Sequence, residues 1–284
     1  VTGDNVLIEG ITFRNFNFAK HGGAVYWNGT QGKLKNCNFI NNTAGYASGA
    51  LFWGSDNGTI SSCNFINNTG SYSGAFDCNA INSTLIGSTF TGNTANNNGG
   101  SICWYGINGK VFDCTFTHNT AITSGGAILW GADNGIISGS TFIDNHATNG
   151  GGINWWRGIN GILIDSTFIN NRAVNGAGVL WGPDGIISGS TFSNNTANNI
   201  GGAIYWFNKG SINDCNFIYS KSVNSNGIYA VRDLNINGGS GIAYIFANAT
   251  LSGISIVVLN NETYYYPPNS NINLTNKNMH KLKT

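Results

Sequence analysis

The stretch that decides the fold lies near the middle of the chain, where residues 125–147 read Gly-Gly-Ala-Ile-Leu-Trp-Gly-Ala-Asp-Asn-Gly-Ile-Ile-Ser-Gly-Ser-Thr-Phe-Ile-Asp-Asn-His-Ala. Two short runs rich in β-branched and aromatic residues are separated by an Asp-Asn-Gly turn, and the stretch has no helical period. Closely similar stretches recur before and after it. The pattern indicates a repeat built from short strands.

The repeat is clearest in three columns of apolar residues. Phenylalanine recurs at intervals of 24 to 26 residues, at positions 13, 39, 65, 90, 116, 142, 168, 192 and 217. Tryptophan is assigned to positions 27, 53, 104, 130, 156, 181 and 206, with Cys78 on the vacant rung, and an aliphatic column runs from Ile8 to Ile212. A unit of this length cannot bury its own apolar face, but stacked copies can. Because a propeller blade needs about 40 residues, the period predicts an all-β fold, a parallel β-helix of about nine coils.

Stacking gives each column an expected role. The Phe and aliphatic columns fill the lumen, the Asn residues three positions after Phe form an amide ladder and tolerate left-handed backbone, and the Gly pairs permit tight corners. The Trp column is either core or an exposed ladder of indoles. The residues two positions before each Trp are almost all apolar, and since alternate residues of a strand share a face, this favours core. The opposite face would then carry a partly aromatic strip, which we consider a candidate binding surface: Tyr26, Phe52, Trp155 and Tyr205.

The composition excludes some classes of protein. Only 9% of the 284 residues are charged, and the net charge is +1, against about 25% charged residues in typical soluble proteins. A nucleic-acid partner is therefore not expected. The chain is rich in Gly (41 residues) and Asn (47 residues). The six cysteines form no CxxC pair, so neither a metal nor a cofactor is expected. We interpret them as small core residues, although Cys37 and Cys63 would be close enough for a disulfide.

A possible polar patch is the main candidate for chemistry. His118 and Asp144 fall on adjacent rungs of one column, and His146 and Arg172 on adjacent rungs two residues further along. Clustered acids, His and Arg would suit a polysaccharide lyase or a glycoside hydrolase. However, the patch holds one acid where a hydrolytic pair needs two, so no catalytic residue is assigned. Asn-x-Ser/Thr triplets at predicted turns indicate possible N-glycosylation of Asn28, Asn41, Asn57, Asn67, Asn82 and Asn194.

The period divides the chain into three predicted segments. Residues 1–231 carry the repeats, 232–262 form degenerate last coils or a cap, and 263–284 form a linker or the start of a further domain. No apolar run approaches the length of a membrane span, so direct membrane insertion of this segment is not expected. We expect any secretion signal or anchor to lie outside this sequence.

The sequence motifs of the coil resemble those of a known repeat. Gly-Gly-Ala-Val (22–25), Gly-Gly-Ala-Ile (125–128 and 201–204) and Phe-Ile-Asn-Asn (39–42, 65–68 and 168–171) resemble the GGAI and FxxN motifs of the polymorphic membrane protein repeat. The wider pattern resembles the adhesin-like, pectin-lyase-like β-helix proteins of gut methanogenic archaea, and this resemblance implies a right-handed, single-stranded parallel β-helix. The resemblance implies a secreted or cell-surface adhesin-like protein without a catalytic site.

Three hypotheses about function follow. The first is a non-enzymatic solenoid that binds glycans or proteins on host or neighbouring cells. The second is a carbohydrate-active β-helix enzyme, and the third is a stalk that displays another domain.

Overall fold

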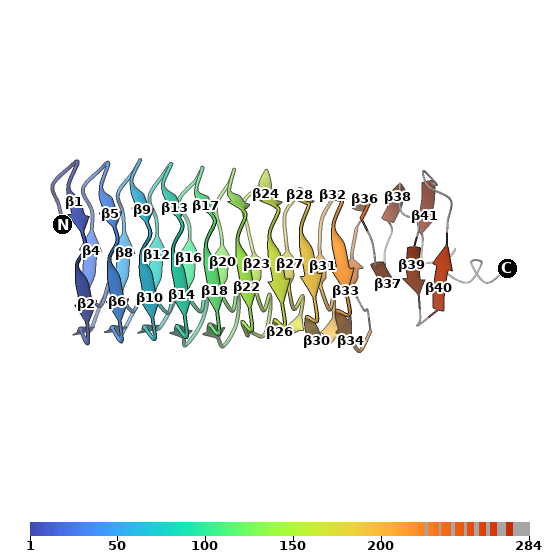
Figure 1. Ribbon diagram of the computed structural model, residues 1–284, viewed down its shortest axis with the longest axis horizontal. Helices are drawn as coiled ribbons and strands as arrows, with labels where there is room; N and C mark the ends of the chain where they lie inside the picture. Colours follow the sequence, from blue (N-terminus) through green and yellow to red (C-terminus); the bar gives the residue numbers. More distant parts are fainter. Residues whose placement is uncertain are drawn as a thin grey trace.

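A computed structural model gives the chain as a rod of stacked coils (Figure 1). It describes residues 1–224, 227–232 and 234–239, together with the backbone of five further strands between residues 242 and 274. The described part of the chain contains strands and turns and no helix. The all-β parallel solenoid predicted from the repeat, with about nine turns, is confirmed.

Two sheets of the rod follow the aliphatic and Phe columns. Sheet A consists of β1 (Leu7–Glu9), β5 (Lys33–Lys35), β9 (Thr59–Ser61), β13 (Thr84–Ile86), β17 (Lys110–Phe112), β21 (Ile136–Ser138), β24 (Gly161–Ile164), β28 (Gly185–Ser188), β32 (Gly210–Asn213), β36 (Leu234–Asn237), β38 (Ala249–Ser252) and β41 (Asn271–Leu274). Sheet B consists of β2 (Thr12–Arg14), β6 (Asn38–Ile40), β10 (Asn64–Ile66), β14 (Thr89–Thr91), β18 (Thr115–Thr117), β22 (Thr141–Ile143), β25 (Thr167–Ile169), β29 (Thr191–Ser193) and β33 (Asn216–Ile218).

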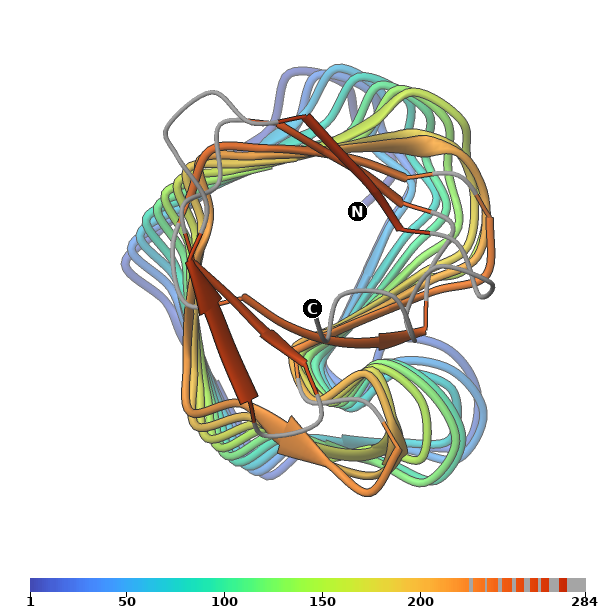
Figure 2. The same cartoon turned by 90° about the vertical axis from the view of Figure 1, so that its right-hand side faces the viewer.

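The other strands complete each coil. Sheet C has two parts, β3 (Asn17–Phe18), β7 (Thr43–Ala44), β11 (Thr69–Gly70), β15 (Thr94–Ala95) and β19 (Thr120–Ala121), then β26 (Arg172–Asn175), β30 (Thr196–Ile200) and β34 (Lys221–Ser222). Sheet D consists of β4 (Val25–Trp27), β8 (Leu51–Trp53), β12 (Phe76–Cys78), β16 (Ile102–Trp104), β20 (Ile128–Trp130), β23 (Ile153–Trp155), β27 (Val179–Trp181), β31 (Ile204–Trp206), β35 (Ile228–Ala230), β37 (Ile242–Phe246), β39 (Ile256–Leu259) and β40 (Glu262–Tyr265). Seen along the rod, the segment between sheets B and D forms a smaller loop beside the main barrel, here called the lobe (Figure 2).

The lumen is filled as the columns predict. Phe65 of β10 pairs in register with Phe39 on one side and Phe90 on the other. Successive rings of the Phe column are stacked, with centroid separations from 4.5 Å (Phe65 and Phe90) to 5.3 Å (Phe192 and Phe217). Phe39 to Phe192 and the aliphatic column from Leu34 to Ile212 are buried. The repeat therefore positions one continuous apolar core along the rod.

The Trp column is core, as parity favoured, but its assignment in one coil was wrong. Trp130 pairs with Trp155, and Trp155 with Trp181, so Trp155 occupies the column and has no exposed surface. Trp156 is 56% exposed. Trp104 follows Phe90 by 14 residues, whereas Trp155 follows Phe142 by 13. Because strand side chains alternate, this difference of one residue exchanges the two faces.

The Asn ladder is confirmed, but the left-handed backbone expected at these Asn residues lies at another position. The Nδ2 of Asn119 donates to Oδ1 of Asn145 on the next coil and to the carbonyl oxygen of Phe90, each at 3.0 Å. The same geometry repeats at Asn42, Asn68, Asn93, Asn145 and Asn171. The expected left-handed backbone falls on the preceding position instead, for example at Asn41 and His118. The ladder residues are buried acceptors and donors, not turn residues.

From the second coil on, the position two residues before each column Phe is Cys or Ser, and this column also forms hydrogen bonds. The backbone N–H of Cys63 donates to Ser88 Oγ at 3.1 Å, and that of Cys114 donates to Ser140 Oγ at 3.2 Å. All six cysteines are buried free thiols. Cys63 Sγ also accepts from the backbone N–H of Cys37 at 3.4 Å, whereas the thiols of Cys37, Cys63, Cys114 and Cys215 donate to backbone carbonyl oxygens two residues earlier in the chain.

Strand pairing continues past residue 231, where the repeat motif ends. In sheet A, β36 pairs in parallel with β32 and β38, and in sheet D, β37 pairs in parallel with β35 and β39. The outermost strands β40 and β41 pair antiparallel with β39 and β38. Much of the predicted segment 263–284 lies outside the described residues.

Candidate functional site

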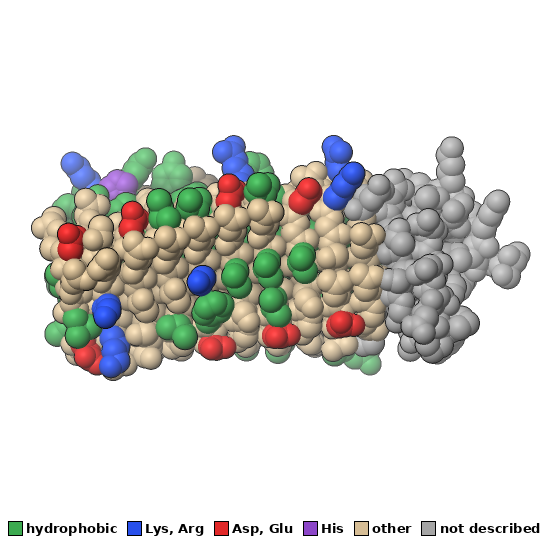
Figure 3. Space-filling model, turned by 90° about the horizontal axis from the view of Figure 1, so that it is seen from above, with side chains coloured by type: hydrophobic (Ala, Val, Ile, Leu, Met, Phe, Trp, Pro, Cys, Tyr) green, Lys and Arg blue, Asp and Glu red, His purple; other side chains and the backbone are tan. Residues whose placement is uncertain are grey.

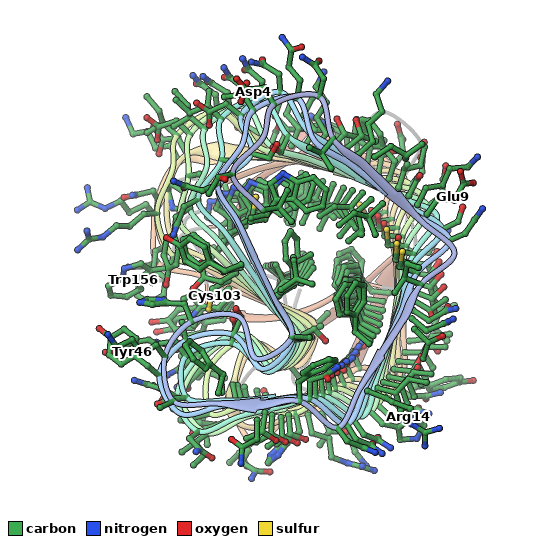
Figure 4. All side chains as sticks on the ribbon, turned by 90° about the vertical axis from the view of Figure 1, so that its left-hand side faces the viewer. Asp4, Glu9, Arg14, Tyr46, Cys103 and Trp156 are labelled. Atoms are coloured by element: carbon green, nitrogen blue, oxygen red, sulfur yellow. The ribbon has the colours of Figure 1, made fainter. Side chains whose placement is uncertain are left out.

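A groove runs along the rod over sheet D and the turns that follow it, and the lobe forms the opposite wall of its first hollow. The groove has two hollows, of about 600 Å³ and 520 Å³, that share Trp156 and Arg157 in their walls. The first is lined by Asn97, Asn98, Tyr105, Thr123, Ser124, Leu129, Gly131, Asn149, Trp156 and Arg157. The second is lined by Trp156, Arg157, Gly158, Leu180, Gly182, Pro183, Phe207, Asn208, Val231 and Arg232. Figure 4 looks along the rod and shows Trp156 on the main body, Tyr46 on the lobe and Cys103 between them.

The floor of the groove is the outer face of sheet D. Its central residues are in register from coil to coil: Tyr26, Phe52, Asp77, Cys103, Leu129, Asn154, Leu180 and Tyr205. Left-handed glycines of the lobe pack directly on this face, because a Cβ on Gly125 would lie 2.6 Å from the nitrogen of Leu129. Any residue with a Cβ at that corner would therefore clash with the backbone of sheet D and hold the lobe away from it.

The predicted aromatic strip on this face is only partly exposed. Tyr26 is 47% exposed, and Phe52 and Tyr205 are half-buried. The prediction that Trp155 faces outward is wrong, because the shorter Phe-to-Trp separation turns it into the lumen. The lobe also covers the intervening positions, so that Cys103, Leu129 and Leu180 are buried.

Three exposed aromatic residues stand on the wall of the groove and were missed by the sequence reasoning. Tyr105, Trp156 and Phe207, here called the aromatic ladder, each follow a strand of sheet D directly and are 42%, 56% and 36% exposed. The intervening rungs are Gly131 and Gly182. A Cβ on Gly131 would lie 2.9 Å from Cδ1 of Tyr105, so glycine leaves room for the ring below. Alternation of aromatic residues and Gly after the column Trp is the sequence signal that could have identified the ladder.

The spacing of the ladder follows from the solenoid. Adjacent coils of a β-helix lie about 4.8 Å apart, and the ladder occupies every second coil. Neighbouring members are therefore roughly 10 Å apart along the rod. Tyr105 and Trp156 line the first hollow, and Trp156 and Phe207 line the second. The groove thus presents three aromatic side chains in a row with a hollow in each interval.

Charged groups in the groove are few. The guanidinium carbon of Arg157 lies 5.8 Å from the ring centroid of Trp156, within the range of a cation–π contact. Arg232 lines the second hollow. Burial raises the pKa of the Tyr105 phenol above its usual range, with smaller contributions from Cys103 and Asp77. Tyr105 is therefore a neutral hydrogen-bonding ring at physiological pH.

At the N-terminal end, aromatic residues pack on one another. The rings of Tyr26 and Phe52 are stacked at 4.7 Å. His21 contacts Phe52 edge-on at 5.4 Å and Tyr46 at 5.0 Å, and Tyr46 contacts Tyr72 at 5.4 Å. These rings join the lobe to sheet D.

Asp77 is a buried carboxyl group on the same face. It is 6% exposed, and its Oδ1 has no hydrogen-bond partner. Burial raises the pKa of Asp77 to about 7 because the charged form is poorly solvated there. Burial, with a smaller coulombic contribution from Asp77, also raises the pKa of the Cys103 thiol on the next rung. No hydrogen bond to Oδ1 and no ion pair with another described side chain compensates for the burial of Asp77.

The polar patch lies elsewhere, at the turn between sheets B and C. His118 Nε2 and Asp144 Oδ2 are 3.6 Å apart, and His146 pairs with Arg172 through a backbone bridge. The adjacent rungs predicted for each pair are thus present, but no contact joins the two pairs.

The asparagines of the six possible N-glycosylation triplets are all exposed: Asn28, Asn41, Asn57, Asn67, Asn82 and Asn194. Among the described residues, no cluster of three His, Cys, Asp or Glu side chains could hold a metal ion.

A comparison with known protein families agrees with the repeat found in the sequence. Residues 113–129 and 189–205 match the family model of the Chlamydia polymorphic membrane protein repeat. Each match runs from the turn before a strand of sheet B, through sheet C, into sheet D. No curated protein and no solved structure matches the chain. The protein is therefore a β-solenoid that carries repeats of the polymorphic membrane protein type. No helix in the described part of the chain is long and apolar enough to cross a membrane.

Proposed function

We propose that this protein is a non-catalytic, adhesin-like solenoid of the cell surface, and that the groove binds an extended polysaccharide chain lying parallel to the rod. The observation that carries the proposal is the aromatic ladder, three exposed rings at a two-coil spacing along one groove. Exposed aromatic side chains stack on the apolar faces of sugar rings. The interval of roughly 10 Å is close to the length of two sugar units in an extended chain.

The remaining walls suit the same ligand. In the first hollow, the side opposite the ladder carries amides and hydroxyls from Asn97, Thr123 and Asn149, which can donate to and accept from sugar hydroxyls. The floor beneath is the apolar side chain of Leu129. A largely apolar concavity with a few polar groups is the usual form of a ligand site. The matches to the polymorphic membrane protein repeat support a surface location, where the groove would attach to glycans of host or neighbouring cells.

The ladder can be tested by removing its central ring. We expect Trp156→Ala to weaken binding of the best glycan on an array by about tenfold or more, because central aromatic residues dominate binding free energies. Binding is measured by fluorescence anisotropy with the labelled oligosaccharide. Since Trp156 is exposed, the melting temperature of the variant should be close to that of the wild type.

Tyr219→Ala is the matched control, because Tyr219 is 84% exposed and lines neither hollow. It should bind as the wild type does. If the wild type retains no polysaccharide from a panel of plant, microbial and animal glycans, the groove does not bind glycans. The stalk hypothesis would then be favoured.

A further inference from the structure

The two hollows of the groove differ in charge. The first has Arg157 only at the end that it shares with the second hollow, and its other polar walls are neutral amides, hydroxyls and a phenol. The second is bounded by two arginines, Arg157 and Arg232. Among the described residues that line either hollow, none is Asp or Glu. In a chain with only 9% charged residues, two cations in one hollow are a local concentration of positive charge. Figure 3 shows how sparsely charged groups are spread over another face of the rod.

Both guanidinium groups are available to a ligand. Neither takes part in an ion pair within the described part of the chain, where the ion pairs are Lys35 with Glu9 and His118 with Asp144. Arg157 lies over the Trp156 ring, so a cation is held beside a ring on which a sugar would stack. Arg157 and Arg232 are both exposed, and they lie three coils apart, roughly 14 Å along the rod.

Two described carboxylates on the turns near the second hollow have other partners and do not line it. Asp133 Oδ1 accepts a hydrogen bond from the backbone N–H of Ile159 at 3.0 Å. Asp184, next to Pro183 in the chain, lines a third hollow of about 440 Å³ together with Lys209. Its Oδ1 accepts a hydrogen bond from the backbone N–H of Lys209 at 3.1 Å. Asp184 is thus engaged on the far side of the turn, and it does not line the hollow that holds the two arginines.

We infer that the second hollow selects an anionic sugar, so that the ligand of the groove is an acidic polysaccharide. This inference rests on the proposed function. A guanidinium group presents a planar fork of donors that matches a carboxylate or a sulfate, and such charge-assisted bonds are stronger than those to neutral hydroxyls. The apolar sides of the hollow, Phe207 and Pro183, contact the ring that bears the anion. The first hollow accepts the neutral units of the same chain.

The test compares matched neutral and acidic oligosaccharides on the whole chain. The probes are chitohexaose, hyaluronan hexasaccharide, oligogalacturonate and a sulfated dextran oligomer, each labelled at the reducing end. We expect at least one acidic probe to bind about tenfold or more tightly than chitohexaose at low salt. Raising the NaCl concentration to about 0.3 M should reduce that preference, because salt screens exposed charges.

Variants identify the source of the preference. The double variant Arg157→Gln and Arg232→Gln should bring the affinity ratio of acidic to neutral probe close to one. The double variant Lys33→Gln and Lys110→Gln removes an equal charge from sheet A, outside the groove, and should leave the ratio unchanged. The carboxylate and sulfate arms decide which anion is preferred.

The outcomes separate the two proposals. Equal affinity of the wild type for neutral and acidic probes overturns the anionic specificity and leaves the polysaccharide groove standing. A preference for acidic probes that survives in the double variant also overturns the assignment to these arginines. Binding of no probe overturns the proposed function itself, and the inference with it.

Discussion

Replacing Asn119 with leucine is expected to lower the free energy of unfolding by about 5 kcal/mol. The side chain is fully buried, and its Oδ1 accepts from both the backbone N–H and the Nδ2 of Asn93, at 2.9 and 3.0 Å. Its Nδ2 also donates to Phe90 and Asn145. Leucine removes all four bonds and leaves neighbouring groups buried without partners, each at a cost of about 1–3 kcal/mol. The midpoint of urea unfolding, followed by Trp fluorescence, measures the change.

A milder substitution at the same position keeps the prediction testable if the leucine variant does not fold. Ser220 ends the ladder naturally, since its Oγ accepts from the backbone N–H of Asn195 at 3.3 Å. Asn119→Ser should therefore lose only part of the stability that Asn119→Leu loses. Asn96→Leu, at an exposed position one coil earlier, should change stability by less than about 0.5 kcal/mol. Equal urea midpoints for Asn119→Leu and Asn96→Leu would mean that the ladder contributes nothing.

Replacing Asp77 with leucine is expected to stabilise the protein at pH 8, by up to about 4 kcal/mol. Asp77 has a pKa of about 7 in the fold, against 3.8 for an ordinary Asp, because burial disfavours its charge. Between these values the unfolded chain releases a proton that the folded chain retains. Stability should therefore fall as the pH rises from about 4 to about 7, and stay level above that.

Later rungs of the same column indicate suitable substitutes for Asp77. Leu129 and Leu180 occupy the same column, as does Asn154, so leucine fits the space on this face. Asp77→Leu should remove most of the pH dependence, and Asp77→Asn should remove the ionisation while leaving a polar group. Urea midpoints at pH 5 and pH 8 provide the measurement. A pH slope in Asp77→Leu equal to that of the wild type would assign the dependence to other groups.

The groups nearest Asp77 do not titrate in this window. The pKa values of the Cys78 and Cys103 thiols and of the Tyr105 phenol are raised, chiefly by burial. All three therefore stay neutral between pH 4 and pH 8 in the folded protein. The pH dependence expected there belongs to the Asp77 carboxyl.

The candidate site could be predicted less well than the fold. Tyr26, Phe52 and Tyr205 were assigned to the correct face, but the lobe partly covers them, and Trp155 was assigned to the wrong side. The aromatic ladder lies one residue beyond the column on which the sequence reasoning concentrated. Tyr105 and Phe207 follow a Trp directly in the chain, yet nothing in that spacing shows that the turn after sheet D borders a hollow.

The sequence alone determined the solenoid, because a period of about 25 residues with recurring Phe, Trp and Asn leaves stacking as the means of burying those residues. It also determined the Phe and aliphatic columns and the Asn ladder. Only the tertiary structure decided which of Trp155 and Trp156 enters the core, since a connection shorter by one residue exchanges the faces of a strand. It also decided where the groove lies. A repeat specifies contacts between like positions of successive coils. The first hollow of the groove instead forms between unlike positions, the lobe and the turn after sheet D, which approach each other only when the coil closes.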